Sequence, residues 1–554
     1  MKALTRTIIA VALGATSLIA QQPPQQTEVP KLMENVDVRV INVDVVVTDR
    51  KGNTVSGLKA EDFEIYENGV PKPVSNFYEI ERAKPINVTP VQTPATPPAA
   101  ATARPVEAQK EDIPDNLRRR IIFFIDNLSL APFNRNKVFK EMKEFAKTSM
   151  RPGDEAMIAT FNRSMKVRMP FTRDAKQIES TLEVIAGESA LGLSNKSERK
   201  DVQGRIKDAQ SYDDAVATAR SYAASVEHDL RQSVESLNGL MSTLAGVEGK
   251  KILVLTSEGF PMQPGKDAFY YIDEVARQKN TGNWQSGSAM LEGMSFDSTS
   301  LIQSIARTAN ANGITLYPIH AGGLDAGNDN SAENAAPTSF TVSQAVVSNS
   351  TDSLRMMAEM TGGLASIQTN NFKGAFDKIR RDLDAYYSLG YRAGTERVDR
   401  QRGLEVRVKN RAYQVRGRQT FVEKSTYAEM SDRVIANLLY KTKANELNIR
   451  VIISAPQAAD EYFKVPVEVQ IPMDSLTLLP LGEDQSAGGF DLYVAVANKE
   501  GDMSDVSRKM QQIRVSAADY KKLKGKYYTY SLDHLMEPGM NKVSIGVVDQ
   551  VANT

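Results

Sequence analysis

The sequence contains no cysteine among its 554 residues. Disulfide bridges and thiolate metal sites are therefore excluded, and so is a lipid anchor on an N-terminal cysteine. If the chain is exported to an oxidising compartment, hydrophobic cores alone must hold it together, and a chain of this length can build them.

An excess of charge of either sign is also lacking. Lys and Arg number 68, and Asp and Glu number 68, so the formal net charge is zero. Because nucleic-acid-binding proteins usually carry a basic excess, we expect no nucleic-acid partner. Beyond the first twenty residues, the sequence has no apolar run long enough to cross a bilayer. We therefore expect no membrane span in the mature chain.

The first residues have the pattern of a secretory signal peptide. A basic start with Lys2 and Arg6 precedes the apolar and small residues 8–20, and a run of glutamine and proline follows. This pattern predicts export to the periplasm or the cell exterior, with cleavage near Ala20. A membrane anchor is the alternative, but the apolar stretch is short for a span.

Changes in hydrophobic period divide the rest of the chain into parts. Alternating apolar residues predict strands near both ends, and apolar runs separated by helical patterns predict an α/β domain between them. The expected parts are a signal peptide (1–20), a disordered tail (21–35), a β-strand segment that packs against another β part (36–82), a Pro/Ala-rich linker (83–117), an α/β domain (118–395) with a helical insertion (188–225), a β extension (396–425) and an Ig-like β-sandwich (430–554).

The central strand of the α/β domain is predicted at residues 121–125, an unbroken Ile-Ile-Phe-Phe-Ile run that ends at Asp126. A run without a polar face is typical of a strand that is buried on both sides of a parallel sheet. Similar runs at 156–161, 252–255 and 314–319 alternate with helical patterns, so we predict a doubly wound sheet of the Rossmann type. Ligand sites in such sheets lie at the carboxyl ends of the strands, where Asp126 stands.

Three segments after residue 320 leave alternatives open. Residues 321–350 are rich in Gly, Asn, Ser and Ala and are expected to form a surface loop. The strands predicted at 387–391 and 404–408 either close the α/β domain or pair with residues 36–82. The segment 392–418 is locally basic, which indicates either the solvated face of strands or a contact for an anionic surface or polysaccharide.

Several motifs resemble the von Willebrand factor A (VWA) domain. Over residues 118–395 the resemblance rests on Phe-Phe-Ile-Asp (123–126), Ala-Thr-Phe-Asn (159–162) and Leu-Val-Leu-Thr-Ser-Glu-Gly (253–259). More narrowly, the chain resembles the exported bacterial VWFA-related family. The motifs for this are Val-Val-Val-Thr-Asp-Arg-Lys-Gly-Asn (45–53), Leu-Lys-Ala-Glu-Asp-Phe-Glu-Ile-Tyr-Glu-Asn-Gly (58–69), Pro-Phe-Thr-Arg-Asp (170–174), Thr-Gly-Gly (361–363) and Tyr-Tyr-Ser-Leu-Gly-Tyr (386–391).

The resemblance implies a metal-ion-dependent adhesion site (MIDAS) that is degenerate in this sequence. Many VWA domains bind a divalent cation through Asp-x-Ser-x-Ser, whose oxygens suit Mg²⁺. Asp126 matches this pattern, but Leu128 and Leu130 occupy the serine positions, and Ser129 is one residue out of register. Glu258 stands where such domains often carry an aspartate. We expect no cofactor and no tight metal binding. The alternative is Mg²⁺ or another divalent ion on Asp126, Ser129 and Glu258.

The predicted function is protein or surface binding by an exported, non-enzymatic protein. The resemblance and the strand ends place the partner-binding edge at Asp126, Asn127, Ser129, Ser257 and Glu258. A scaffold role in an envelope assembly is the second prediction.

A hydrolase is the third prediction. Ser257, His320 and Asp126 each stand at the end of a predicted strand, and together they could supply a nucleophile, a base and an acid. The Gly-x-Ser-x-Gly pattern of a nucleophile elbow is missing, however. We therefore expect no catalytic activity and leave the partner's identity open.

Overall fold

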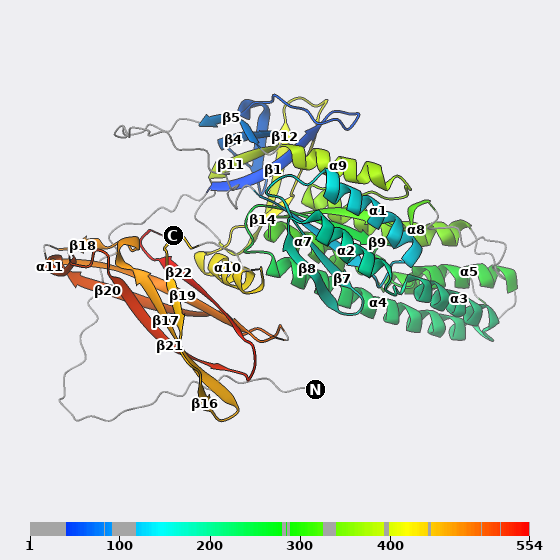
Figure 1. Cartoon of the computed structure of the whole chain (residues 1–554). Helices are drawn as coiled ribbons and strands as arrows, with labels where there is room; N and C mark the ends of the chain where they lie inside the picture. Colours follow the sequence, from blue (N-terminus) through cyan, green and yellow to red (C-terminus); the bar gives the residue numbers. More distant parts are fainter. Residues whose placement is uncertain are drawn as a thin grey trace.

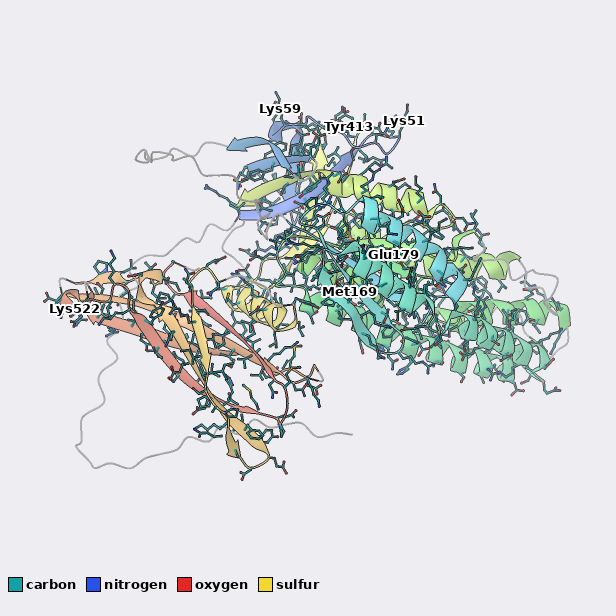
Figure 2. All side chains as sticks on the ribbon, in the orientation of Figure 1. Lys51, Lys59, Met169, Glu179, Tyr413 and Lys522 are labelled. Carbon is teal, nitrogen blue, oxygen red and sulfur yellow. The ribbon has the colours of Figure 1, made fainter. Side chains whose placement is uncertain are left out.

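The structure is a computed structural model that describes residues 40–81, 84–90, 118–279, 284, 289–324, 340–392, 398–440, 445–482, 484–499, 501–520 and 522–552. The predicted signal peptide (1–20), the tail (21–35) and residues 91–117 of the linker lie outside these ranges. Figure 1 shows the chain as an α/β lobe, a β lobe and a C-terminal sandwich. In Figure 2, Glu179 and Met169 mark the α/β lobe, Lys59 and Tyr413 the β lobe, and Lys522 the sandwich.

The α/β lobe is built on a five-stranded sheet of order β10-β9-β6-β7-β8. Strand β6 lies at its centre and is buried along its whole length, as its apolar run predicts. The strands β10, β9, β6 and β7 are parallel, and β8 is an antiparallel edge. Their bounds are Arg119–Asp126 (β6), Glu155–Phe161 (β7), Met165–Thr172 (β8), Lys250–Ser257 (β9) and Ile314–His320 (β10). The predicted α/β domain is thus present.

Helices cover both faces of this sheet. Because side chains alternate along a strand, Ile121, Phe123 and Ile125 of β6 pack on one face, and Ile122 and Phe124 pack on the other. The first face is covered by α1 (Pro132–Thr148), α2 (Ala175–Ala186) and α9 (Phe372–Asp384), and the second by α4 (Tyr212–Thr243), α7 (Thr299–Ala311) and α8 (Phe340–Thr361).

The helical insertion is larger than the sequence suggests. Helix α3 (Gly192–Asp208) packs with the first half of α4, and these helices share a separate core with α5 (Lys266–Lys279) and α6 (Ala289–Met294). The border predicted at 225 is wrong, because α4 is continuous there. Its buried stripe runs on through Ala219, Ala223 and Leu230 without a helix-breaking residue.

The β lobe combines the first described strands with the strands after α9. Two sheets, β13-β1-β11-β4-β5 and β14-β12-β2-β3, enclose one core. Their bounds are Val40–Thr48 (β1), Phe63–Glu67 (β2), Val70–Lys72 (β3), Val74–Glu81 (β4), Lys84–Pro90 (β5), Ala385–Arg392 (β11), Gln401–Val408 (β12), Gln414–Gly417 (β13) and Thr420–Val422 (β14). The N-terminal β segment therefore pairs with the strands after residue 384.

Three predicted borders change as a result. Strand β11 pairs with β1 and β4, so the α/β lobe ends at Asp384 rather than at 395. Strand β5 pairs with β4, so residues 84–90 belong to the β lobe and not to the linker. The segment predicted as a β extension (396–425) supplies strands β12 to β14 of the same lobe.

The C-terminal sandwich begins with a helix instead of a strand. Helix α10 (Thr426–Tyr440) packs Val434 and Leu438 against the sandwich, while its Ala436 joins a core of the α/β lobe. The two sheets that follow contain β15 (Arg450–Ile453), β16 (Gln457–Ala459), β17 (Tyr462–Pro472), β18 (Leu479–Leu481), β19 (Gln485–Ala497), β20 (Ser507–Ser516), β21 (Tyr527–Met536) and β22 (Lys542–Asp549), with a short helix α11 (Ala517–Tyr520).

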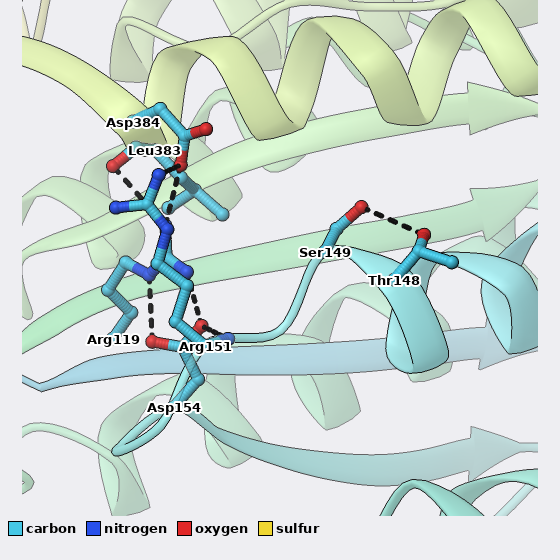
Figure 3. Close-up of polar contacts among 7 residues, drawn as sticks. All are labelled: Arg119, Thr148, Ser149, Arg151, Asp154, Leu383 and Asp384. Atoms are coloured by element: carbon cyan, nitrogen blue, oxygen red, sulfur yellow. Dashed lines mark hydrogen bonds and ion pairs between the residues drawn. The ribbon is translucent and has the colours of Figure 1, made fainter. Parts of the chain in front are cut away.

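A buried ion-pair network fixes the amino end of β6 (Figure 3). Arg119 is 3% exposed and forms an ion pair with Asp154 from the turn before β7. Its Nη1 also donates to Asp384 Oδ1 at 3.1 Å, at the end of α9. Since Asp384 directly precedes β11, the network fixes the point where the chain passes from the α/β lobe into the β lobe. In the described part of the chain, no helix has the length and apolarity to cross a membrane.

Candidate functional site

The candidate site lies where β6, β9 and β10 end side by side. The register pairs His320 with Ser257, and the pairing of Ile125 with Thr256 brings Asp126 next to Ser257. The chain continues from β6 to β7 on one side of the sheet and later returns to β9 on the other. Such a reversal of strand order opens a crevice at the carboxyl edge of doubly wound sheets.

Asp126 is the centre of a closed polar triangle. Its Oδ2 accepts hydrogen bonds from Ser129 Oγ and Ser257 Oγ, each at 2.7 Å. The two hydroxyl oxygens lie 3.0 Å apart. Asp126 is 2% exposed, and its Oδ1 has no hydrogen-bond partner among the described residues. Burial raises the pKa of Asp126, and the two serine hydrogen bonds oppose that rise.

The two leucines of the degenerate motif pack into opposite cores. Leu128 is 6% exposed and joins the core on the α4 face, whereas Leu130 is fully buried on the α1 face. The loop is therefore anchored on both sides of the sheet, with Ser129 between the two anchors. This packing explains why leucine stands at positions where the VWA pattern has serine.

Asn127 is buried beneath the carboxyl edge of the sheet, where it binds Arg135. It is 2% exposed, and its Oδ1 accepts from Nη1 of the buried Arg135 at 3.0 Å. Arg135 Nη2 donates to the backbone oxygens of Ala186 (2.9 Å) and Glu188 (3.0 Å). The prediction that Asn127, Asp126 and Ser257 touch a partner needs correction, because all three are buried. The sequence carries no signal for Arg135, which lies in an ordinary helical turn.

Glu258 is already occupied by this chain's own groups. Its Oε1 accepts from Ala131 N and Asn134 Nδ2, each at 3.1 Å, at the start of α1. Its Oε2 lies 3.5 Å from Lys196 Nζ of α3. Glu258 thus satisfies backbone and side-chain donors at a helix start whose cap residue, Ala131, has no side-chain acceptor. Lys196 comes from the helical insertion, and sequence reasoning missed it.

The residues present do not fit the divalent cation that the VWA pattern implies. An octahedral ion needs several free oxygen ligands. Here Asp126 Oδ2 and both serine hydroxyls bond to one another, and Glu258 is held by Ala131, Asn134 and Lys196. The unpaired Oδ1 of Asp126 supplies one ligand. Over the described ranges there is also no group of three or more His, Asp or Glu that could hold a metal.

Asp126, Ser257 and His320, the residues of the hydrolase alternative, lie together at the edge, but their hydrogen bonds are not those of a catalytic triad. A triad places the histidine between the nucleophile and the acid. Ser257 Oγ instead donates to Asp126 and accepts from Gly259 N at 3.0 Å. His320 Nδ1 has no hydrogen-bond partner within the described part of the chain. Burial lowers the pKa of His320. This geometry gives no support to nucleophilic catalysis.

Exposed apolar side chains surround this closed centre. Phe133 at the start of α1 is 73% exposed, Leu193 at the start of α3 is 61% exposed, and Leu324 after β10 is 67% exposed. Phe133 could have been found in the sequence, because it falls outside the helical stripe of buried residues that begins with Arg135 and Val138.

Hydrogen bonds from backbone N–H groups hold the segments that carry the exposed Leu193 and Leu324. Gly192 N donates to Leu130 O at 3.0 Å, which places Leu193 beside the loop after β6. Leu324 N donates to Asn370 Oδ1 at 3.2 Å, near the start of α9. Helices α1 and α9 pack side by side. Lys137 Nζ lies 4.3 Å from the centroid of the Phe133 ring. The edge thus combines apolar side chains with lysines.

Comparison with known proteins found no matching family model and no matching curated protein. Among solved structures, an aerotolerance-related membrane protein from Bacteroides fragilis is 11% identical; the match covers 48% of this chain and 98% of that one, with a TM-score of 0.24. BatB from Bacteroides thetaiotaomicron is 9% identical; the match covers 48% of this chain and 96% of that one, with a TM-score of 0.20. Manganese-loaded TRAP protein from Plasmodium vivax is 11% identical; the match covers 55% of this chain and 94% of that one, with a TM-score of 0.20. All TM-scores are low, so the fold is established here by strand order and packing.

Proposed function

We propose that this chain is an exported, non-enzymatic binding protein whose VWA-like α/β lobe holds a protein partner without a metal ion. The contact surface is the edge patch, which we define as Phe133, Lys137, Leu193, Lys196 and Leu324. The single observation that carries the proposal is the exposed Phe133, 73% accessible at the switch point of the sheet. Export rests on the N-terminal sequence pattern alone.

The edge patch has the composition of a protein-interaction surface. Aromatic anchors dominate many interfaces because they bury a large apolar area with little loss of conformational freedom. Burying a Phe or Leu side chain stabilises a complex by about 1.5–3 kcal/mol. The backbone beneath Phe133 and Leu193 is held by buried anchors, so little ordering is needed when a partner binds.

Lysines determine the charge that the partner should carry. Lys196 lies against Glu258, and Lys137 lies over the ring of Phe133. Among VWA domains a bound cation commonly meets a carboxylate of the partner, whereas here Lys196 supplies the positive charge at that part of the edge. We therefore expect the partner to present an acidic side chain beside an apolar one.

A scaffold role in an envelope assembly is the second candidate. It is favoured by α10, which packs on both the α/β lobe and the sandwich. A Cβ added to Gly246 would lie 2.2 Å from Asp432 O, and one added to Gly546 would lie 2.8 Å from side-chain atoms of Met430 and Val434. Close packing on both sides of α10 would suit a fixed spacer.

Affinity capture with surface variants tests the binding proposal. The full chain, Phe133→Ser, Lys196→Glu and the control Met510→Ser are immobilised and exposed to the envelope fraction of the source cell. Met510 is 69% exposed but lies on the sandwich. We expect Phe133→Ser to weaken capture about thirty-fold, which is the effect of losing about 2 kcal/mol at a hot spot. Equal capture by Phe133→Ser and Met510→Ser would contradict the proposal.

A further inference from the structure

A cavity of about 570 Å³ lies between the β lobe and the amino end of the α/β sheet. The sheet β13-β1-β11-β4 buries one face in the β-lobe core, with residues such as Val43 and Leu389. Its other face turns toward the starts of β9 and β10, and the cavity opens between them. Junctions between lobes are frequent sites for small ligands.

Polar residues cross the β-lobe wall of the cavity in one row. Asp44 of β1 pairs with Ser388 of β11, and Ser388 pairs with Tyr78 of β4. Arg418 follows β13, in which Gly417 pairs with Val45, so Arg418 stands next to Asp44. All four residues line the cavity, and Lys250 and Lys251 at the start of β9 line the opposite wall.

The acidic groups at this junction are already paired. Lys250 Nζ lies 3.0 Å from Asp44 Oδ2. Arg416 Nη2 lies 2.8 Å from Asp382 Oδ1. Each of these two aspartates thus already has a cation as its direct partner.

Neither Arg418 nor Lys251 forms a direct ion pair among the described residues, although Asp44 lies near Arg418 and Asp432 lies near Lys251. Arg418 Nη2 donates to Asn42 O at 2.7 Å, but its buried Nε has no hydrogen-bond partner there. Lys251 is 6% exposed, and its Nζ donates only to the backbone oxygens of Ala245 (3.3 Å) and Val247 (2.6 Å). Burial lowers the pKa of Lys251 to about 7. Holding charged groups away from water without a direct ion pair is costly.

We propose that this cavity binds a small oxyanion, a phosphate or a carboxylate group, with the Arg418 guanidinium as its main ligand. The planar guanidinium donates paired hydrogen bonds that match the oxygens of such groups. Lys251 and the hydroxyls of Tyr78 and Ser388 offer further donors around the same space. This site is separate from the edge patch and stands whether or not the partner-binding proposal holds.

The anion should tie the two lobes together. Its ligands come from β13 and its neighbours on one side and from β9 on the other, so the bound anion bridges the junction. A ligand that binds only the folded protein raises its unfolding temperature, and the rise grows with the logarithm of the ligand concentration above the dissociation constant. The locally basic segment 392–418 thus contributes a specific buried ligand. Its Arg402 and Arg407 pair instead with Glu67 and Glu405.

Thermal unfolding and calorimetric titration of the full chain test this site. Inorganic phosphate and succinate are the two probes, and chloride at matched ionic strength is the reference. We expect at least one probe to bind and raise the unfolding midpoint of the wild type. Arg407→Gln, the control at an exposed arginine of the same lobe, should respond equally. The probe that binds distinguishes a phosphate site from a carboxylate site.

Two substitutions separate a built site from general charge effects. Arg418→Gln should abolish the shift, and Arg418→Lys, which keeps the charge and is the safer variant for folding, should bind at least ten-fold more weakly because the fork of donors is lost. No shift of the wild type with either probe, as expected if ordered water alone fills the cavity, would overturn the proposal. So would an undiminished shift in Arg418→Lys.

Discussion

One carboxylate oxygen of Asp126 accepts hydrogen bonds from two serine hydroxyls of the same chain. The hydroxyls of Ser129 and Ser257 each donate to Asp126 Oδ2 at 2.7 Å, and Asp126 itself is 2% exposed. Because the carboxylate is desolvated, burial raises the pKa of Asp126. The residue therefore positions the loop after β6, and Ser129 with it, rather than presenting a charge to a ligand.

Substitution of Asp126 separates these roles. Asp126→Asn keeps an acceptor for the serines, so we expect its unfolding free energy to stay within about 1 kcal/mol of the wild type at neutral pH. Asp126→Ala leaves the hydroxyls of Ser129 and Ser257 without their acceptor and should lose about 2–5 kcal/mol. Urea unfolding measures both. Unequal wild-type midpoints in Mg²⁺ and in EDTA would contradict this account.

The difference in unfolding free energy between the wild type and Asp126→Asn should change with pH in a defined direction. The folded state keeps the Asp126 proton to a higher pH than the unfolded chain, whose carboxyl titrates near an ordinary value of about 4. As pH rises from about 4 toward 7, the wild type therefore loses stability relative to Asp126→Asn. A gain in wild-type stability relative to Asp126→Asn over the same pH range would show that the folded carboxylate is stabilised as an anion.

At this scale, the sequence identifies the strand-end residues but not their surroundings. Asp126, Ser257 and His320 can be placed at one edge because parallel strands end together. Lys196 and Arg135 cannot be found in this way, since their partners are fixed by tertiary packing. Burial also decides against Asn127 as a contact residue, and no local pattern predicts that burial.

The element that shapes the edge is the first turn of α3. A Cβ added to Gly192 would lie 2.4 Å from both Leu130 C and Ser129 O, which are backbone atoms of the loop after β6. Glycine at this position allows the insertion to press against the loop after β6. The contact connects the helical insertion to the position of Leu193 and Lys196.

A pair of glycine substitutions in α3 tests that contact. Gly192→Ala should lower the unfolding free energy by about 1–3 kcal/mol, because the loop must shift to relieve the overlap. Gly204→Ala in the same helix has nothing within 4 Å of the new Cβ and should be stabilising by up to about 1 kcal/mol, as alanine favours a helix. Equal effects in thermal unfolding would show that α3 does not press on the loop.

The accuracy of sequence prediction differs between strands and helices here. The four parallel strands are recognisable because each is an apolar run buried on both faces. The sequence predicts a loop over residues 321–350, yet α8 begins at Phe340. Its first turns consist largely of Thr, Ser, Val and Asn, which favour helices only weakly, and the helix is supported by contacts such as Met262 N to Asn349 O at 3.1 Å.

At the scale of the whole molecule, distant segments complete each lobe. Residues 40–81 are too few for a stable core, so the need for a β partner can be predicted from the sequence. Which partner it is cannot, because the pairing of β1 with β11 spans more than three hundred residues and leaves no local trace. Helix α10 likewise packs on both the α/β lobe and the sandwich, through Ala436 on one side and Val434 and Leu438 on the other, and no local pattern predicts these contacts.

Partner capture in the presence and absence of divalent metal tests the central claim, that the edge patch binds without an ion. The immobilised full chain is incubated with the envelope fraction in 5 mM EDTA or in 5 mM MgCl₂, two conditions chosen at roughly physiological ionic strength. We predict the same partner in equal amount under both conditions, lost in Phe133→Ser. Retention in MgCl₂ with release in EDTA would contradict the account and restore the metal to the site around Asp126.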